Sequence, residues 1–340
     1  MQRKSIIDEP IHILGAGGIG VAIAWCLLRD GKDVTLVDSN KVKILAGQKN
    51  GLTVVDQGTE HPAFIDFEDW IPPARGLILL CTKTYDNPSV LSRLQDKSSL
   101  IPIQNGFDPQ LEKCNHSGEA IASFVSECLR DQPITRITRP GCLHIGARRE
   151  VGEAEREVLA LLGKSLATVD LFPVEIVADV RPYKAAKLMY NAAISPLAAA
   201  AGVDNGELLG DPLANRLFFA LLQENYGILQ NAGIPLAKIG PFHPDTVSRI
   251  LRTPLLPALM AVFFRPSLRG TYCSMAPDMA SGHTEIEAYN GHLIRLARDF
   301  PCPINRAALA MINKIVDEKL PVQRQHLQTM ADNLPTGVLS

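Results

Sequence analysis

The chain has 340 residues, 46% of them hydrophobic and 21% charged, and a formal net charge of −2 at pH 7. This composition indicates a globular protein, and the length exceeds the usual size of one compact core, so two domains are expected. The near-neutral balance gives no basic field for nucleic acid or an anionic membrane, and neither is an expected partner. The first residues are polar and lead into Asp8 and Glu9 rather than into an apolar stretch, which argues against a signal peptide. No apolar run approaches the ~20 residues of a membrane span.

The seven cysteines are scattered, odd in number and never spaced as a CxxC pair. This pattern is typical of reduced thiols in a cytoplasmic protein rather than of a disulfide framework or a zinc site. We therefore expect a cytoplasmic protein in which the cysteines are small core residues and no metal is bound.

The first predicted strand, Ile11–Leu14, runs into the glycine-rich turn Gly15-Ala16-Gly17-Gly18-Ile19-Gly20. In such a turn Gly15 permits the tight reversal, Gly17 lets a pyrophosphate approach the backbone, and Gly20 lets the following helix pack closely on the sheet. A diphosphate would bind the backbone N–H groups at the positive end of that helix. The turn predicts that residues 15–20 bind a dinucleotide.

The second predicted strand, Val34–Val37, ends at Asp38, which lies 18 residues after Gly20. A carboxylate at this position accepts the adenosine ribose hydroxyls and repels a 2′-phosphate, so NADH is expected in preference to NADPH. Lys41 and Lys83 keep NADPH as the alternative.

Four more apolar runs alternate with helical segments as far as about residue 147, at Leu77–Cys81, Leu100–Ile103, Ala120–Val125 and Cys142–Ile145. This alternation predicts an α/β, Rossmann-type domain with an open parallel sheet. Cofactors bind beyond the carboxyl ends of such strands. The loops Thr82-Lys83-Thr84 and Gln104-Asn105-Gly106, each after a strand, are therefore candidate cofactor contacts.

After about residue 150 the pattern changes to helical periodicity, at Glu153–Leu162, Ala185–Ile194, Leu213–Leu229, Ser248–Met260, Glu285–Ala297 and Ala307–Glu318. Asp170–Ile176 has the character of a linker. We expect a Rossmann-type NAD(P)-binding domain over residues 1–177 and a mostly α-helical substrate and catalytic domain over 178–340.

One predicted helix places Lys187, Asn191 and Ser195 at i, i+4 and i+8, on a single face among apolar neighbours. Buried lysine and asparagine side chains need polar partners, so this stripe is a candidate site. The alternative is a solvated face that happens to align.

A second signal lies at Ser281–Gly291, where Thr284 and Glu287 have the spacing of a capping box. That gives Glu287 a structural role and leaves Glu285 as a candidate anionic partner for a buried lysine. The alternative is a first-turn acid favoured by the helix dipole. His283 and His292 have no metal-like companions and are expected to be structural or exposed.

These motifs occur in the order of one family: the glycine turn, Thr82-Lys83, Gln104-Asn105-Gly106, Lys187-x-x-x-Asn191, Cys273-Ser274-Met275 with Asp278, and His283-Thr284-Glu285-Ile286. Together they resemble the ketopantoate reductase (2-dehydropantoate 2-reductase) family over roughly residues 10 to 320.

The resemblance implies reduction of a 2-oxo acid, foremost ketopantoate to pantoate, with NAD(P)H. It implies that Lys187 is the general acid and that Glu285 orients it. Asn191 and Ser274 would bind the substrate, Asn105 would lie near the nicotinamide, and Lys83 near the adenosine ribose. The expected partner is thus a small 2-oxo acid, with a homodimer as a further state to test.

Two departures bear on specificity. Family members usually carry an arginine after the second strand, where this chain has Asp38 and Ser39, and position 195 is serine where a second asparagine that helps hold substrate is more usual. The alternatives to a ketopantoate reductase are an opine- or 3-hydroxyacid-type dehydrogenase and a non-catalytic NAD(H) sensor.

Overall fold

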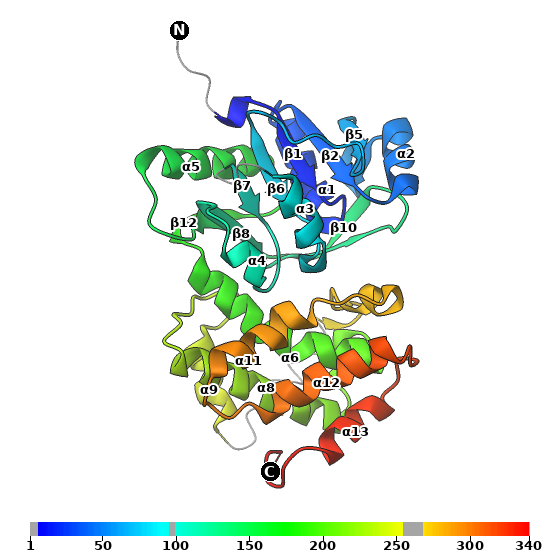
Figure 1. Cartoon of the computed structure of the whole chain (residues 1–340), viewed down its shortest axis with the longest axis vertical. Coiled ribbons are helices and arrows are strands. Elements are labelled where there is room, and N and C mark those ends of the chain that lie inside the picture. The colour runs from blue at the N-terminus through cyan, green and yellow to red at the C-terminus, as the bar shows by residue number, and fades with distance from the viewer. Residues whose placement is uncertain (1–5, 95–98, 254–267, 340) are drawn as a thin grey trace. The chain divides into compact units, whose positions relative to one another are not determined.

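The computed structural model describes residues 6–94, 99–253 and 268–339 (Figure 1). Among them, contacts join the chain up to Asn105 with Pro109–Arg181 in one compact unit, and Gly106–Asp108 with the chain from Pro182 onward in a second. Each unit has its own hydrophobic core. The boundary expected at 177/178 falls inside a strand of the first unit.

The first unit is built on a five-stranded parallel sheet of order β5-β2-β1-β6-β7. Its strands are β1 (Ile11–Leu14), β2 (Val34–Asp38), β5 (Ala63–Asp66), β6 (Leu77–Leu80) and β7 (Leu100–Pro102). The central strands are apolar and almost wholly buried, as expected where helices cover both faces of a parallel sheet. The first crossover is α1 (Gly18–Arg29), whose residues from Gly20 to Leu27 are all buried.

Two smaller sheets complete the strands of this unit. One has the order β4-β3-β10-β9, and the other the order β12-β11-β8. Their bounds are β3 (Leu52–Val54), β4 (Gly58–Glu60), β8 (Gly118–Ala122), β9 (Val125–Cys128), β10 (Ile134–Arg139), β11 (Leu143–Ala147) and β12 (Val174–Asp179).

Two sequence-based expectations were wrong here. The runs near residues 120 and 142 do not extend the parallel sheet: β8 and β11 pair antiparallel in a separate sheet. No helix lies between them to carry the chain back for parallel pairing. The presumed linker 170–176 enters β12, which pairs parallel with β11 after the crossover helix α5 (Glu153–Ala167). As an edge strand in which every residue is exposed or half-buried, β12 carries a weak hydrophobic signal.

The remaining elements of the first unit are short. They are η1 (Ile6–Asp8), α2 (Lys41–Asn50), η2 (Thr84–Asp86), α3 (Asn87–Arg93) and α4 (Pro109–Glu112).

In its described residues the second unit contains helices and no strand. Its elements are α6 (Arg181–Ala201), α7 (Asn205–Leu208), α8 (Pro212–Asn231), α9 (Pro244–Leu251), η3 (Ala276–Ser281), the π-helical turn η4 (Glu287–Gly291), α11 (His292–Ala297), α12 (Pro303–Asp317) and α13 (Gln325–Asp332). The helix expected over 248–260 is seen only as α9, and residues 254–267 lie outside the described residues.

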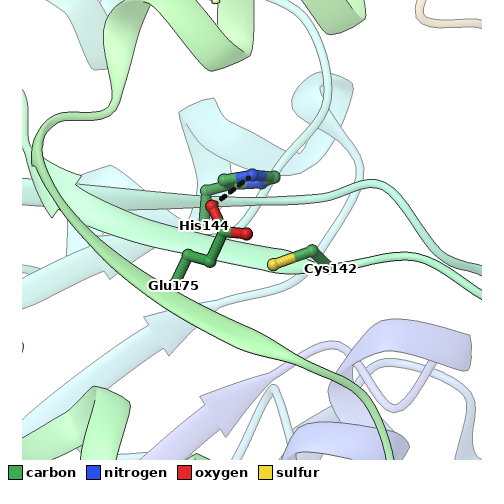
Figure 2. Close-up of side chains that lie close together, drawn as sticks. All are labelled: Cys142, His144 and Glu175. Atoms are coloured by element: carbon green, nitrogen blue, oxygen red, sulfur yellow. Dashed lines mark ion pairs between the residues drawn. The ribbon is translucent and has the colours of Figure 1, made fainter. Parts of the chain in front are cut away.

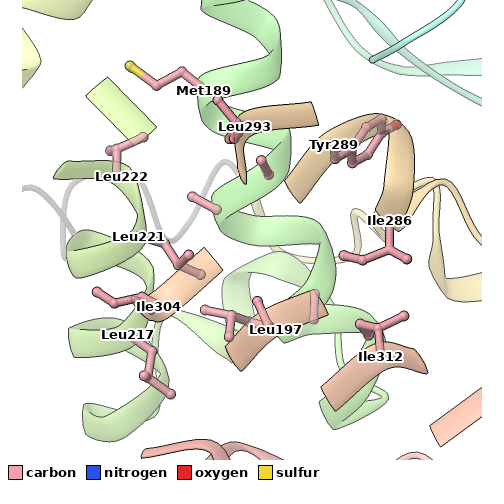
Figure 3. Close-up of a cluster of buried hydrophobic side chains, with 14 of the residues drawn as sticks. Met189, Leu197, Leu217, Leu221, Leu222, Ile286, Tyr289, Leu293, Ile304 and Ile312 are labelled. Atoms are coloured by element: carbon pink, nitrogen blue, oxygen red, sulfur yellow. The ribbon is translucent and has the colours of Figure 1, made fainter. Parts of the chain in front are cut away.

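Aliphatic side chains of α6, α8, η4, α11 and α12 form the core of this unit (Figure 3). Leu197 of α6 and Leu217 and Leu221 of α8 have no solvent exposure. This core surrounds α6 and fixes the helix that carries the predicted polar stripe. Within the described residues, no helix has the length and apolar character needed to cross a bilayer.

Candidate active site

The glycine turn has the geometry that each glycine was expected to provide. Gly15 has φ +98°, and a Cβ there would lie 2.8 Å from the Thr82 backbone nitrogen. A Cβ on Gly20 would lie 1.9 Å from the Gly15 carbonyl oxygen, so only glycine lets α1 pack against the turn. A Cβ on Gly17, by contrast, would meet nothing within 4 Å. The backbone is therefore open where a diphosphate would approach.

Gly17 is also the N-cap of α1, and no side chain caps the helix. The first-turn N–H groups of a helix need a partner, and an anion supplies one. The open backbone at Gly17 and the uncapped helix start both fit a dinucleotide.

The side chain of Asp38 is held against this turn. Its two carboxylate oxygens accept hydrogen bonds from the backbone N–H of Ala16, at 2.7 Å, and of Asn40, at 2.9 Å. Asn40 in turn caps α2 by accepting from the Lys43 N–H. These bonds orient the carboxylate at the carboxyl end of β2, beside the residues expected to hold the dinucleotide.

Lys43 is a member of this neighbourhood that sequence reasoning missed. It is buried, and its Nζ donates to the Ala16 carbonyl oxygen at 3.1 Å. Lys41, singled out from the sequence, instead points its exposed ammonium at Glu68, 2.8 Å away. Its hydrogen bond to Glu68 raises its pKa. The two lysines are two positions apart on α2, so they project in different directions.

The two candidate loops after β6 and β7 are tied together by Gln104. Its side-chain amide donates to the Thr82 carbonyl oxygen at 2.8 Å and to Asn87 Oδ1 at 2.9 Å. Lys83, which follows Thr82, and Asn105, which follows Gln104, are half-buried in these loops. Lys83 and Asn105 thus both lie at the carboxyl ends of the strands of the parallel sheet.

In the second unit, Lys187, Asn191 and Ser195 lie on α6. The first two are half-buried and Ser195 is buried, with its carbonyl oxygen accepting from Cys273 Sγ at 3.5 Å. The expected helix ended before Pro196, but α6 continues through that proline to Ala201.

Pro196 lacks the N–H that would bond the Ala192 carbonyl one turn earlier. The side-chain amide of Asn290 fills this place, donating to the Ala192 oxygen at 2.9 Å. Asn225 donates in the same way to the Met189 oxygen. Asn305 is bonded to both asparagines, at 2.9 and 2.8 Å, and all three are fully buried. This network fixes the backbone on either side of Asn191.

Tyr289 brings together three of the predicted site residues of this unit, Asn191, Ser274 and Glu285, but neither Lys187 nor Ser195 is among its hydrogen-bond partners. Its side chain is fully buried, and its hydroxyl lies 3.2 Å from Glu285 Oε2 and 3.3 Å from Ser274 Oγ. The Asn191 side chain is a further hydrogen-bond partner. Burial and the neighbouring Glu285 raise the pKa of Tyr289 well above its ordinary value. Tyr289 was missed from the sequence, where its place four residues after Glu285 was the available signal.

Glu285 is only 3% exposed and precedes the N-cap of η4, which disagrees with the alternative of a first-turn acid favoured by the helix dipole. The capping box expected at Thr284 and Glu287 was wrong. The N-cap of η4 is Ile286, with no side-chain cap, and Glu287 lies 3.4 Å from Arg295. Short π-helical segments of this kind are frequent at functional sites.

Lys184, one turn before the half-buried Lys187, is a fully buried lysine of α6. Its Nζ lies 4.8 Å from the centre of the Phe107 ring, which stacks on His292 at 4.5 Å. The Phe107 N–H donates to the Ala288 carbonyl oxygen at 3.0 Å. Burial, with Arg295 and Lys184 nearby, lowers the pKa of His292 to about 4.

Comparison with known proteins identifies the family. Residues 11–147 match the family model described as ketopantoate reductase PanE/ApbA, and residues 179–316 match its C-terminal model. The chain belongs to the ketopantoate reductase family. It is an oxidoreductase, and the family assigns it a nicotinamide cofactor, consistent with the open glycine turn.

Among similar curated proteins, the 2-dehydropantoate 2-reductase of Pyrococcus horikoshii is 25% identical over 89% of this chain and 96% of its own length. That of Aquifex aeolicus is 24% identical over 85% and 90%. A PanE/ApbA family ketopantoate reductase from Ralstonia eutropha has a similar fold, with a TM-score of 0.69 and 22% identity over 92% of this chain and all of that one. D-mandelate dehydrogenase, solved with NADH and anilino(oxo)acetate, has a TM-score of 0.73 and 18% identity over 91% and 99%.

Proposed function

We propose that the protein reduces a 2-oxo acid to a 2-hydroxy acid with NADH, and that 2-dehydropantoate is its substrate. The observation that carries the proposal is the buried cluster in which the Tyr289 hydroxyl meets Asn191, Ser274 and Glu285. Three residues expected from separate motifs converge on one hydroxyl. The names of the curated relatives support the substrate.

In this proposal the first unit holds the cofactor. The turn of residues 15–20 binds the diphosphate, Asp38 accepts the ribose hydroxyls, and Lys83 and Asn105 contact the cofactor from the loops after β6 and β7. When bound, the reduced nicotinamide supplies a hydride to the substrate carbonyl carbon. The carboxylate of Asp38 disfavours a 2′-phosphate, which is why we propose NADH over NADPH.

The second unit supplies the proton and the substrate contacts. Lys187 donates a proton to the carbonyl oxygen, and its ammonium stabilises the negative charge developing there. Glu285 orients Lys187, while Asn191, Ser195 and Ser274 bind the substrate's hydroxyl and carboxylate groups. A second candidate substrate is a different 2-oxo acid, because position 195 is serine where the family more often has asparagine. We favour an aromatic 2-oxo acid for this candidate, because the D-mandelate dehydrogenase structure contains anilino(oxo)acetate.

The test is to measure NADH and NADPH oxidation with a panel of aliphatic, branched and aromatic 2-oxo acids that includes 2-dehydropantoate. We expect the highest kcat/KM with 2-dehydropantoate and NADH. A protein that binds NADH but oxidises it with no member of the panel would be a sensor. Turnover that also requires an amine would indicate an opine dehydrogenase.

Lys187→Ala is expected to lower kcat by about 10²–10⁴-fold while NADH affinity stays the same, since only the proton donor is removed. Lys187→Arg is the matched control, because a guanidinium keeps the charge but does not give up its proton. If Lys187→Ala turns over like the wild type, the proposed acid is wrong.

We further propose a homodimer, because a solved ketopantoate reductase from Staphylococcus aureus is described as dimeric. Light scattering after gel filtration tests this, with a mass near 74 kDa expected from the 37.0 kDa chain. A mass of one chain at micromolar concentration would contradict it.

A further inference from the structure

A cysteine, a histidine and a glutamate come together on the three-stranded sheet of the first unit (Figure 2). His144 of β11 is paired in register with Glu175 of β12, and Cys142 lies two residues before His144 on the same face. One potential ligand atom from each side chain lies within 4.8 Å of the others. None of the three takes part in the proposed reaction.

The spacing suits a metal ion. Zinc bonds of about 2.0–2.3 Å at tetrahedral angles separate ligand atoms by roughly 3.3–3.8 Å. The His144 Nε2 to Glu175 Oε2 distance is already 3.3 Å. The side chain of Glu175 is 58% exposed and that of His144 4%. The strands thus hold the imidazole firmly, while the half-buried Cys142 and the exposed Glu175 side chains have room to change rotamer and close the wider gap.

We infer that Cys142, His144 and Glu175 form a binding site for Zn²⁺ or a similar divalent transition metal, with water as the fourth ligand. Thiolate, imidazole and carboxylate together favour zinc over Mg²⁺ or Ca²⁺, which take oxygen ligands. The ion joins edge strand β12 to β11 and stabilises the folded protein, because this ligand set is assembled by strand pairing and does not exist in the unfolded chain.

Metal binding exchanges a proton for the ion at Cys142, because the thiolate and not the thiol is the ligand. As the metal–sulfur bond forms, the sulfur–hydrogen bond breaks and the proton is released to solvent.

Cobalt is the probe for the test. Untagged, reduced and chelator-treated full-length protein is titrated with Co²⁺, which gives a near-ultraviolet charge-transfer band when a thiolate binds it. We expect a band that saturates at one equivalent, is displaced by Zn²⁺, and is accompanied by a rise in Tm with Zn²⁺. Cys142→Ser should abolish the band, and Glu175→Gln should weaken binding at least tenfold.

Two matched variants serve as controls. Cys114→Ser removes another half-buried cysteine, and Glu157→Gln another exposed acid, and both should titrate like the wild type. Because Cys142 and Glu175 are not fully buried, their variants should fold, which circular dichroism checks. The inference is overturned if wild type shows no band at millimolar Co²⁺, if Cys142→Ser retains it, or if Glu175→Gln binds as tightly as the wild type.

Discussion

Asp38 sets the proposed cofactor preference through a carboxylate that is already positioned. Two backbone N–H groups hold it at 2.7 and 2.9 Å, so little side-chain entropy remains to be lost when a ribose binds. Its partner Ala16 lies in the glycine turn, which couples the orientation of the acid to the shape of the turn. Substitutions of Asp38 can therefore distinguish the effect of its charge on cofactor preference from the effect of its hydrogen bonds.

Asp38→Asn should shift the ratio of kcat/KM for NADH to that for NADPH toward NADPH by about tenfold, because the amide removes the charge but keeps an acceptor. Asp38→Arg should shift it further, by about a hundredfold, since a guanidinium attracts the 2′-phosphate. Steady-state kinetics with both cofactors measure the ratio. A wild-type enzyme that strongly prefers NADPH would contradict our interpretation of Asp38.

Tyr289 is a positioning residue that the sequence motifs did not reveal. Tyr289→Phe removes one hydroxyl from the contacts with Glu285, Ser274 and Asn191 and leaves the ring in place. Leaving buried polar groups without this partner costs about 1–3 kcal/mol. We expect a Tm lowered by a few degrees and a kcat/KM lowered about tenfold or more.

The control is Tyr190→Phe on α6, which removes the hydroxyl of a half-buried tyrosine and should keep wild-type kinetics. If Tyr289→Phe lowers Tm but leaves both kcat and KM unchanged, the hydroxyl is structural and does not position the site.

At the scale of elements, α1 depends on two glycines for different reasons. Gly20→Ala places a Cβ 1.9 Å from the Gly15 oxygen, so helix and turn must separate, and we expect a large loss of stability or no folded protein. Gly17→Ala meets nothing within 4 Å and should fold with nearly the wild-type Tm. Its methyl group stands where the diphosphate approaches, so NADH affinity should fall at least tenfold.

Thermal melts and NADH fluorescence titrations distinguish the two effects. The proposed place of the diphosphate would be wrong if Gly17→Ala bound NADH as tightly as the wild type.

Helix α6 illustrates a boundary that local pattern could not predict. A proline usually ends or kinks a helix, yet α6 continues past Pro196 because Asn290, nearly a hundred residues later, bonds the freed Ala192 carbonyl. The polar stripe of α6 was visible as periodicity. The support that holds it in place was not visible, since it comes from η4 and α8, which α12 joins.

For the whole molecule, two separate cores mean that stability can be followed in each unit. Both tryptophans, Trp25 and Trp70, are buried in the first unit, so their fluorescence reports on that unit. Far-ultraviolet circular dichroism reports strongly on the helical second unit. Acid sensitivity of the second unit can thus be distinguished from that of the first.

His292 is expected to make the second unit acid-sensitive. Its pKa is about 4 in the folded protein against 6.5 for an ordinary histidine, so the unfolded chain binds the proton more readily. Above about pH 6.5 the histidine is neutral in both states and does not lower the free energy of unfolding. As the pH falls from 6.5 toward 4, protonation of the unfolded chain lowers the free energy of unfolding by up to about 3 kcal/mol. His292→Phe keeps a ring against Phe107 and removes the titration.

Urea unfolding followed by circular dichroism at pH 7 and pH 4.5 measures this difference. The wild type should lose more stability between the two pH values than His292→Phe does. His12 and His144 in the first unit also have lowered pKa values from burial, so the comparison must be between variant and wild type. Equal losses would contradict the prediction.

The sequence by itself determined the features that depend on neighbours along the chain. The roles of Gly15 and Gly20, the acid at the end of β2 and the stripe on α6 follow from turn geometry and helical spacing, which are local properties. Tertiary structure alone decided which distant side chains meet. Tyr289 with Ser274, Asn290 with Ala192, and Cys142 with Glu175 are joined by packing and strand pairing between elements far apart in the chain. Spacing along the sequence does not encode such contacts, because they exist only once those elements have packed.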